Sequence, residues 1–227
     1  MKIAEKDNCF KYNIDAYGDD RIMKTVIYTQ RVEIVSDYQE RRDCADQRIA
    51  DFIIECGFLP LPVPNKKELS VEIIKNVKPS GIILTGGNSL RTYGGNAPER
   101  DAMDEALIGL AIQNVIPLYG FCRGMQSILS YFGNNLENVE GHVAVRHIIR
   151  EGAEQYEVNS YHNQACKKIK KDCGLLVDAE SRDGVIESIH HEKYPIIGTM
   201  WHPEREKCFA KKDIAKVKEL LYNSERR

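Results

Sequence analysis

The sequence predicts an α/β fold: a mostly parallel sheet with helices on its faces and an added antiparallel section. Between Thr25 and Gly133, short apolar runs alternate with segments of helical periodicity, which is typical of parallel strands linked by helices. Beyond Gly133 the runs alternate apolar and polar residues, and Ser-Arg-Asp-Gly at 181–184 indicates a hairpin turn. The length of 227 residues and 42% hydrophobic content suit one globular domain.

The first 22 residues are polar and aperiodic, and the first convincing strand comes directly after Met23. We therefore expect residues 1–22 to be an N-terminal extension that is flexible or lies on an edge, and residues 23–227 to form the domain. Met23 is an alternative start of translation.

The first half of the domain alternates strands and helices. Apolar residues at helical spacing predict helices, and the prolines of the second strand place it at an edge of the sheet. The continuous apolar run of the third strand is typical of a strand buried on both faces. The expected elements are a strand at Thr25–Gln30, a helix at Tyr38–Cys56, a strand at Phe58–Val63, a helix at Leu69–Val77 and a strand at Gly81–Thr85.

A glycine-rich loop, residues 85–96, follows the buried strand and precedes a helix expected at Pro98–Gln113. Ligands of open parallel sheets bind outside the carboxyl ends of the strands. A phosphate cradle is one interpretation, although the spacing is not that of a P-loop and no lysine is present, and an ordinary surface turn is another. We favour a third, in which a Gly-Gly backbone N–H forms half of an oxyanion hole and the N–H of Arg123 forms the other half.

Residues 117–126, Pro-Leu-Tyr-Gly-Phe-Cys-Arg-Gly-Met-Gln, predict a buried strand, a sharp turn and the start of a helix. We place the strand at Ile116–Tyr119 and the helix at Arg123–Phe132. Glycines at 120 and 124 suit the close backbone approach that such a corner requires. Cys122 would then lie at a helix N-terminus, where the partial positive charge of unpaired N–H groups favours the thiolate. A small buried core residue is the alternative interpretation of Cys122.

A second strand-like run, Ile196–Glu204, ends in His-Pro-Glu. A cysteine nucleophile needs a base, and the base needs a carboxylate that orients it. Pro203 disfavours helix at His202, and in an extended backbone residues two apart point the same way, so Glu204 can support the His202 ring. Cys122, His202 and Glu204 are therefore a candidate catalytic triad.

The remaining elements are mostly antiparallel. We expect strands at Val143–Arg150, Gln155–Asn159, Gly174–Ala179 and Val185–Ile189, and a closing helix at Phe209–Tyr222.

The other histidines show no metal-ligand spacing in the sequence. We expect surface positions for His142, His147, His190 and His191. His162 lies in the polar cluster Ser-Tyr-His-Asn-Gln, where it would contact substrate, support the loop or serve as an alternative base.

Composition excludes several classes of protein. A net charge of −2 gives no electrostatic reason to bind nucleic acid. Apolar runs are shorter than the roughly 18 residues of a membrane span, so no membrane partner is expected. Seven cysteines, an odd number without a Cys-x-x-Cys pair, argue against a disulfide framework and a structural zinc site. We infer a cytoplasmic protein.

Six motifs, in this order along the chain, resemble those of the class I glutamine amidotransferase-like γ-glutamyl hydrolases, the peptidase C26 family that includes γ-glutamyl-GABA hydrolase. The resemblance runs from about Thr25 to the C-terminus. The motifs are Thr-Gly-Gly (85–87), Arg-Asp-x-x-x-x-x-Leu (100–107), Gly-Phe-Cys-Arg-Gly-Met-Gln (120–126), Val-Asn-Ser-Tyr-His-Asn-Gln (158–164), Asp-Gly-Val-Ile-Glu (183–187) and Trp-His-Pro-Glu (201–204).

This resemblance implies a flavodoxin-like doubly wound core and a reaction in which Cys122 attacks the γ-carbonyl of a glutamyl amide. His202 would shuttle protons and Glu204 would orient it, while N–H groups of Gly87 and Arg123 would hold the oxyanion. No metal or organic cofactor is implied.

The resemblance also implies contacts to the glutamyl group from Gln126, Asn88 and the loop Ser160, Tyr161 and His162. Many family members carry Asp where Asn88 stands, and the loop after Gly87 departs from the family pattern. The leaving group therefore stays open.

Three functions compete. The first is a hydrolase of a small γ-glutamyl compound, acting as a monomer or homodimer, with γ-glutamyl-CDP-amidate of capsular phosphoramidate synthesis and γ-glutamyl-GABA of polyamine catabolism as candidate substrates. The second is a glutaminase subunit that passes ammonia to a separate synthase. The third is a non-catalytic binding module of the same fold.

Overall fold

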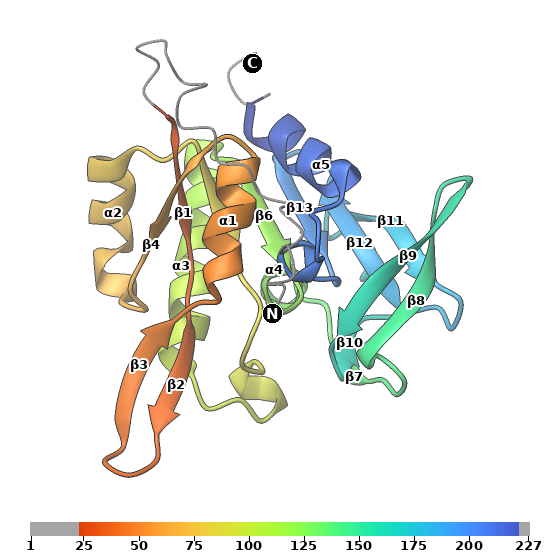
Figure 1. Cartoon of the computed structure of the whole chain (residues 1–227), viewed down its shortest axis with the longest axis horizontal. Coiled ribbons are helices and arrows are strands. Elements are labelled where there is room, and N and C mark those ends of the chain that lie inside the picture. The colour runs from red at the N-terminus through yellow and green to blue at the C-terminus, as the bar shows by residue number, and fades with distance from the viewer. Residues whose placement is uncertain (1–22, 223–227) are drawn as a thin grey trace, which may run out of the picture.

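The computed structural model describes residues 23–222, which form a nine-stranded sheet with helices on both faces (Figure 1). The expected N-terminal extension, residues 1–22, lies outside the described residues. The strand order is β4-β1-β5-β6-β13-β12-β11-β8-β9. The strands are β1 (Thr25–Tyr28), β4 (Leu59–Pro62), β5 (Gly81–Leu84), β6 (Leu118–Phe121), β8 (Val143–Glu151), β9 (Glu154–Tyr161), β11 (Leu175–Ser181), β12 (Ile186–His191) and β13 (Ile196–Thr199).

The first five strands in this order, β4 to β13, are all parallel. Every residue of β5 and β6 is buried, as expected for apolar runs covered on both faces. β4 lies at the edge, where its two prolines remove few ladder hydrogen bonds. The predicted α/β class and the edge position of this strand are confirmed.

Two hydrophobic cores cover the two faces of the parallel strands, and neighbouring residues of one strand enter different cores. Ile82 packs in the core beneath α2, α3 and α4, whereas Ile83 packs in the core beneath α1 and α5. This alternation makes the sheet doubly wound. The helices are α1 (Gln47–Glu55), α2 (Ser70–Val77), α3 (Pro98–Asn114), α4 (Arg123–Tyr131) and α5 (Lys211–Tyr222).

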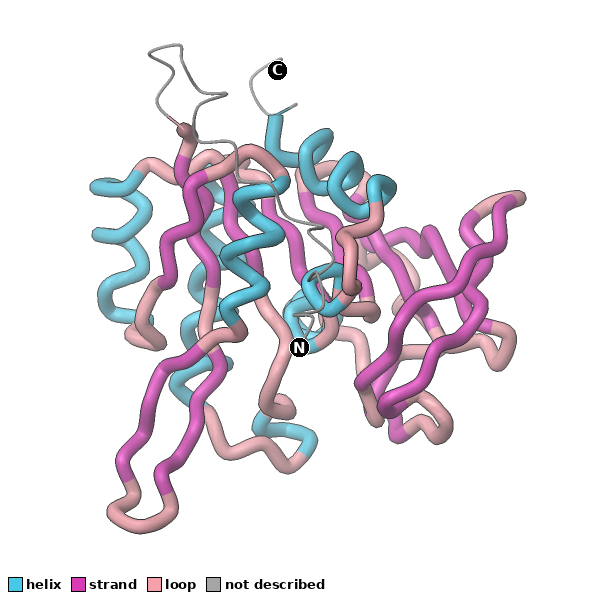
Figure 2. The backbone as a smooth tube through the Cα atoms, in the orientation of Figure 1, coloured by secondary structure: helices cyan, strands magenta, loops and turns pink. Residues whose placement is uncertain are grey.

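The other half of the sheet, β12 to β9, is antiparallel, as predicted (Figure 2). The predicted hairpin turn joins β11 to β12, and the Gly184 N–H donates to the Ser181 carbonyl at 3.1 Å. A small core of Ile149, Val158, Ala179 and Trp201 fills this part of the molecule. Beside it lies a two-stranded ladder of β7 (Glu137–Asn138) and β10 (Gln164–Ala165).

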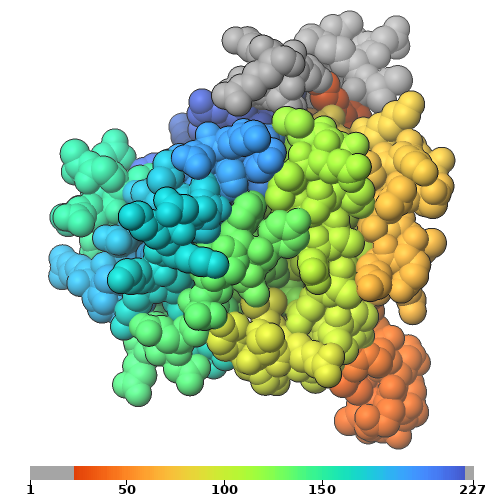
Figure 3. All heavy atoms as spheres, turned by 180° about the vertical axis from the view of Figure 1, so that it is seen from behind, coloured from red at the N-terminus to blue at the C-terminus, as the bar shows by residue number. Residues whose placement is uncertain are grey.

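The helix expected at Tyr38–Cys56 is wrong in its first half. Residues before Asp46 instead form a hairpin of β2 (Arg31–Val35) and β3 (Glu40–Cys44), which projects from the body of the molecule (Figures 1 and 3). Four of the five β3 residues are exposed, so this stretch offers no apolar face to a core. The helix begins at Gln47 because Asp46 caps it by accepting from the Arg48 N–H at 3.0 Å.

Smaller differences concern element ends. β6 covers Leu118–Phe121 and not Ile116–Tyr119, because its register with β13 carries the strand up to the turn. Short 3₁₀ helices occur at Lys67–Leu69, Arg91–Tyr93 and Pro203–Arg205. Within residues 23–222, no helix combines the length and apolarity that a membrane crossing requires.

Candidate active site

Cys122 occupies a sharp turn between β6 and α4 at the carboxyl end of the parallel strands. Its backbone has φ of +51° and ψ of −108°, which is a strained conformation for a residue other than glycine. A Cβ atom at Gly124 would lie 2.0 Å from the Leu84 carbonyl oxygen, and one at Gly120 would lie 2.7 Å from the Gly124 backbone. The predicted turn is therefore confirmed, and both glycines are required by close backbone approach.

His202 follows β13, the strand that lies beside β6. Its Nδ1 lies 2.6 Å from Glu204 Oε1, and its ring also hydrogen-bonds the Cys122 side chain. The structure thus brings together the three side chains of the candidate triad. The backbone after His202 turns into a 3₁₀ helix, so the expected extended geometry holds at His202 alone, and this turn brings the Glu204 carboxylate to the ring.

Asn159 fixes the backbone of His202 from the neighbouring antiparallel half. Its Oδ1 accepts from the His202 N–H at 2.9 Å, and its Nδ2 donates to the His202 carbonyl at 2.8 Å. No sequence pattern reveals this role, because only the fold brings positions 159 and 202 together.

The electrostatics of the site favour a protonated imidazole. Burial alone would lower the pKa of His202, but the negative charges of Cys122 and Glu204 outweigh burial and raise it to about 10. At neutral pH the ring is therefore an imidazolium positioned beside the sulfur. Such a pair is the usual form of an activated cysteine nucleophile.

The loop after β5 is held in place by the buried guanidinium of Arg100. This group donates to the carbonyls of Thr85 at 2.7 Å, Gly86 at 2.9 Å and Gly87 at 2.6 Å. Gly87 has a φ of +88°, and a Cβ atom at Gly86 would lie 2.6 Å from His202 Cε1. The loop therefore packs directly against the imidazole, and only glycine fits at position 86.

Arg123 is the first residue of α4, so its backbone N–H has no acceptor within the helix. Its side chain points away from Cys122 and forms ion pairs with Asp101 and Asp104 of α3. Its Nη1 also donates to Ser127 Oγ at 3.2 Å. Only the backbone of Arg123 is thus available beside the sulfur.

The five expected substrate contacts are placed differently from one another. Tyr161 is partly exposed, and its ring centroid lies 5.6 Å from that of His202. Gln126 is buried and donates to the Gln164 carbonyl at 2.8 Å, while Ser160 donates to the His142 carbonyl at 2.7 Å. Asn88 bonds the backbone of Val32 in the projecting hairpin with both ends of its amide.

His162, the fifth, lies buried in a cluster with His142, His147 and Glu187. The surface position expected for His142 is wrong, because its ring is enclosed by this cluster. His191 is also buried, against the rings of Phe132 and Tyr194.

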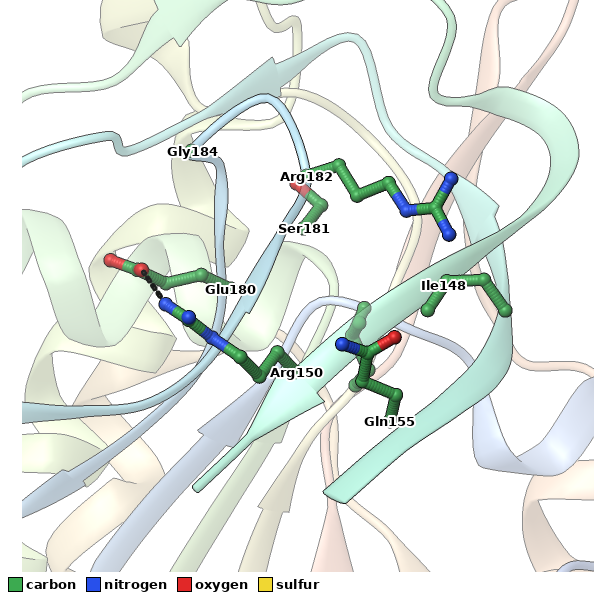
Figure 4. Close-up of a pocket in the computed structure, with 8 residues that line it drawn as sticks. Ile148, Arg150, Gln155, Glu180, Ser181, Arg182 and Gly184 are labelled. Carbon is green, nitrogen blue, oxygen red and sulfur yellow. Dashed lines mark ion pairs between the residues drawn. The ribbon is translucent and has the colours of Figure 1, made fainter. Parts of the chain in front are cut away.

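A hollow of about 290 Å³ opens beside the candidate triad. It is lined by Gly86, Gly87 and His202, and the projecting hairpin contributes Arg31 to its wall. A second hollow of about 300 Å³ lies in the antiparallel half, where Figure 4 shows Arg150 extended toward Glu180 and Arg182 pointing away from both. No candidate triad residue lines this second hollow.

Comparison with known proteins agrees with this geometry. Residues 40–217 match the family model described as glutamine amidotransferase class-I. The chain belongs to the class I glutamine amidotransferase family. The resemblance noted in the sequence is thereby confirmed.

Relatives of this class I amidotransferase have several activities. The γ-glutamyl-CDP-amidate hydrolase of Campylobacter jejuni is 32% identical over 185 residues, which cover 78% of this chain and 88% of the relative. A γ-glutamyl-γ-aminobutyrate hydrolase of Escherichia coli is 28% identical and covers 70% of this chain and 77% of its own length. Anthranilate synthase component 2 of Methanothermobacter marburgensis is 25% identical, with 75% of this chain and 88% of the relative covered.

The class I amidotransferase fold is also found by structural comparison. A crystal structure from Thermoplasma acidophilum, described as that of a GMP synthase subunit, superposes with a TM-score of 0.65 over 91% of this chain and 96% of its own. The sequence identity is 19%, so this match concerns the fold alone.

Proposed function

We propose that this protein is a cysteine hydrolase that cleaves the γ-glutamyl amide bond of a small compound and releases glutamate and an amine. The observation that carries the proposal is the connected set of Cys122, His202 and Glu204 at the strained turn. Relatives named as γ-glutamyl hydrolases support the same reaction.

In the first half of the proposed reaction, the Cys122 thiolate attacks the γ-carbonyl carbon. The resulting oxyanion is held by the backbone N–H groups of Gly87 and Arg123, and the His202 imidazolium gives its proton to the leaving nitrogen. The C–N bond breaks, the amine departs and a γ-glutamyl thioester remains. Loss of one oxyanion donor in a comparable site costs about 3–4 kcal/mol of activation free energy.

In the second half, the neutral His202 takes a proton from water as the water oxygen attacks the thioester carbon. A second oxyanion forms at the same two N–H groups and collapses as the C–S bond breaks. Glutamate leaves, and the thiolate and imidazolium are restored. Glu204 retains its charge throughout and keeps Nδ1 of His202 protonated.

γ-Glutamyl-CDP-amidate is our first candidate substrate, because the Campylobacter jejuni hydrolase of that compound matches 78% of this chain. γ-Glutamyl-GABA is the second candidate, from the Escherichia coli relative. The amine side of either compound would occupy the hollow beside Gly87 and Arg31.

Glutamate release from γ-glutamyl-CDP-amidate, γ-glutamyl-GABA and glutamine tests the proposal. We expect turnover of a γ-glutamyl compound by the wild type and loss by at least about 10⁴-fold in Cys122→Ala. Cys44→Ala is the matched control, because the Cys44 thiol lines the same hollow. Turnover that survives in Cys122→Ala, or that is lost in Cys44→Ala, would show that Cys122 is not the nucleophile.

A second candidate function is a glutaminase subunit that supplies ammonia to a synthase. The matches to anthranilate synthase component 2 and to the GMP synthase subunit favour it. In that case glutamine would be the preferred substrate, and hydrolysis by the isolated chain would be slow. Failure on all three compounds would favour this function or a binding role for the fold.

A further inference from the structure

Three histidines and one glutamate meet inside the antiparallel half of the sheet, away from the elements that carry Cys122. His142 lies directly before β8, His147 lies within β8 and His162 lies directly after β9. Glu187 comes from β12. Figure 1 shows these three strands in the same half of the molecule. We call these four residues the histidine cluster.

All three imidazoles direct a nitrogen at one carboxylate oxygen. Glu187 Oε1 lies 3.5 Å from His142 Nδ1, 3.3 Å from His147 Nε2 and 3.6 Å from His162 Nε2. The facing atoms of His142, His147 and Glu187 all lie within 4.8 Å of one another. These separations exceed the usual length of an N–H···O hydrogen bond. They are close to the spacing of about 3.4 Å between ligand atoms that surround one tetrahedral ion at about 2.1 Å.

The facing atoms are also buried and have no hydrogen-bond partner among the described residues. This holds for Nδ1 of His142, Nε2 of His147, both ring nitrogens of His162 and both carboxylate oxygens of Glu187. The Glu187 side chain is completely inaccessible to solvent. A buried carboxylate requires a compensating positive charge, and its ion-pair partners in the described part of the chain are the imidazoles alone.

The outer contacts of the cluster resemble those around metal-binding histidines. The second nitrogen of His142, Nε2, lies 3.0 Å from Asp183 Oδ2. Asp183 in turn accepts from Ser181 Oγ at 2.5 Å. A ligating histidine usually bonds a carboxylate through its other nitrogen, which fixes the tautomer and the ring orientation. Asp183 would therefore leave Nδ1 of His142 free to bind an ion.

We propose that His142, His147 and Glu187, with His162 as fourth ligand, bind a divalent transition-metal ion, with Zn²⁺ as the first candidate. Three imidazoles and a carboxylate suit Zn²⁺, and four protein ligands make a closed, structural site. The ion would join β8, β9 and β12. It would also fix the strand end that carries Asn159 and Tyr161, both of which contact His202.

Metal uptake by tag-free protein tests this proposal without any substrate. We expect about one zinc ion per chain by mass spectrometry after dialysis, and a lower melting temperature after treatment with a chelator, restored by added Zn²⁺. Cobalt substitution should give the visible absorption bands of a tetrahedral site. Cys122→Ala should bind zinc as the wild type does, so the result does not depend on the proposed hydrolase activity.

Two variants and one control locate the site. Asp183→Asn, at a half-exposed position, should weaken zinc binding by about 10–100-fold. His147→Ala should weaken it further, because a direct ligand is lost. His190→Ala is the control, since this histidine of β12 pairs with Asp178 outside the cluster. Wild-type protein that takes up no zinc, or His147→Ala that keeps wild-type affinity, would overturn the proposal.

Discussion

The two halves of the sheet position the proposed active site in different ways. The parallel half presents Cys122 through backbone geometry, by a strained turn whose neighbouring glycines allow the chain segments to touch. The antiparallel half presents no reacting group, but its Asn159 holds the backbone of His202 by two hydrogen bonds. The nucleophile therefore depends on close packing and the base on polar contacts at the junction of the halves.

Glu204→Gln should have the largest effect on this arrangement, because it removes the charge that orients and stabilises the imidazolium. We expect kcat to fall by roughly 10³–10⁴-fold, as for comparable carboxylate-to-amide changes. The control is Glu33→Gln, which alters a carboxylate of the same hollow that pairs with Arg31. An equal loss in both variants would mean that the charge of the hollow, and not the contact with His202, matters.

The same variant should change the pH profile. The folded-state pKa of His202, about 10, lies above its ordinary 6.5, so the stabilisation from its charge pair is complete below pH 6.5 and is lost as the pH rises toward 10. Removal of the Glu204 charge lowers this pKa, and the alkaline limb of kcat/KM should move to lower pH. An unchanged limb would exclude His202 as the group that titrates there.

Gly124→Ala should damage the nucleophile half by steric overlap. The added carbon would lie 2.0 Å from a backbone oxygen of β5, so we expect a loss of about 3 kcal/mol or more in the free energy of unfolding. Gly184→Ala in the antiparallel hairpin is the control: its φ is +79°, but its Cβ would meet open space. There we expect about 1 kcal/mol from backbone strain alone. Urea titration measures both, and equal losses would contradict the role of close packing.

Asn159→Ala should affect the base half. Two hydrogen bonds to the His202 backbone are lost, and a shift of about 1 Å in a catalytic group can cost about 10²-fold in rate. The control is Asn163→Ala, an exposed residue of the same motif. We expect kcat to fall for Asn159→Ala while the rate of Cys122 alkylation stays near that of the wild type. Unchanged kcat would show that the antiparallel half does not position His202.

The parallel half could be predicted from the sequence because its determinants are local. Buried strands are continuous apolar runs, and the turn at Cys122 is defined by two glycines within five residues. The hairpin β2–β3 could not be predicted from its charged residues. Its buried residue Val32 is held by the Asn88 amide, from a loop 56 positions along the chain.

The same reason explains what was missed in the antiparallel half. The members of the histidine cluster are spread over residues 142–187, without the short spacings by which ligand sets are recognised. Asn159 was overlooked because its partner is a backbone group of a residue 43 positions away. The triad could be predicted because cysteine, histidine and glutamate each lie in a short, characteristic motif.

Arg150→Ala should have the smallest effect and tests whether the hollow in Figure 4 belongs to the proposed site. Arg150 lies 3.9 Å from Glu180, and both side chains are exposed. Because surface ion pairs contribute about 0–1 kcal/mol, we expect a change in unfolding free energy below about 1 kcal/mol and unaltered kcat/KM. A large loss of turnover would mean that substrate contacts extend across the antiparallel half, and the separation between a reacting half and a supporting half would no longer hold.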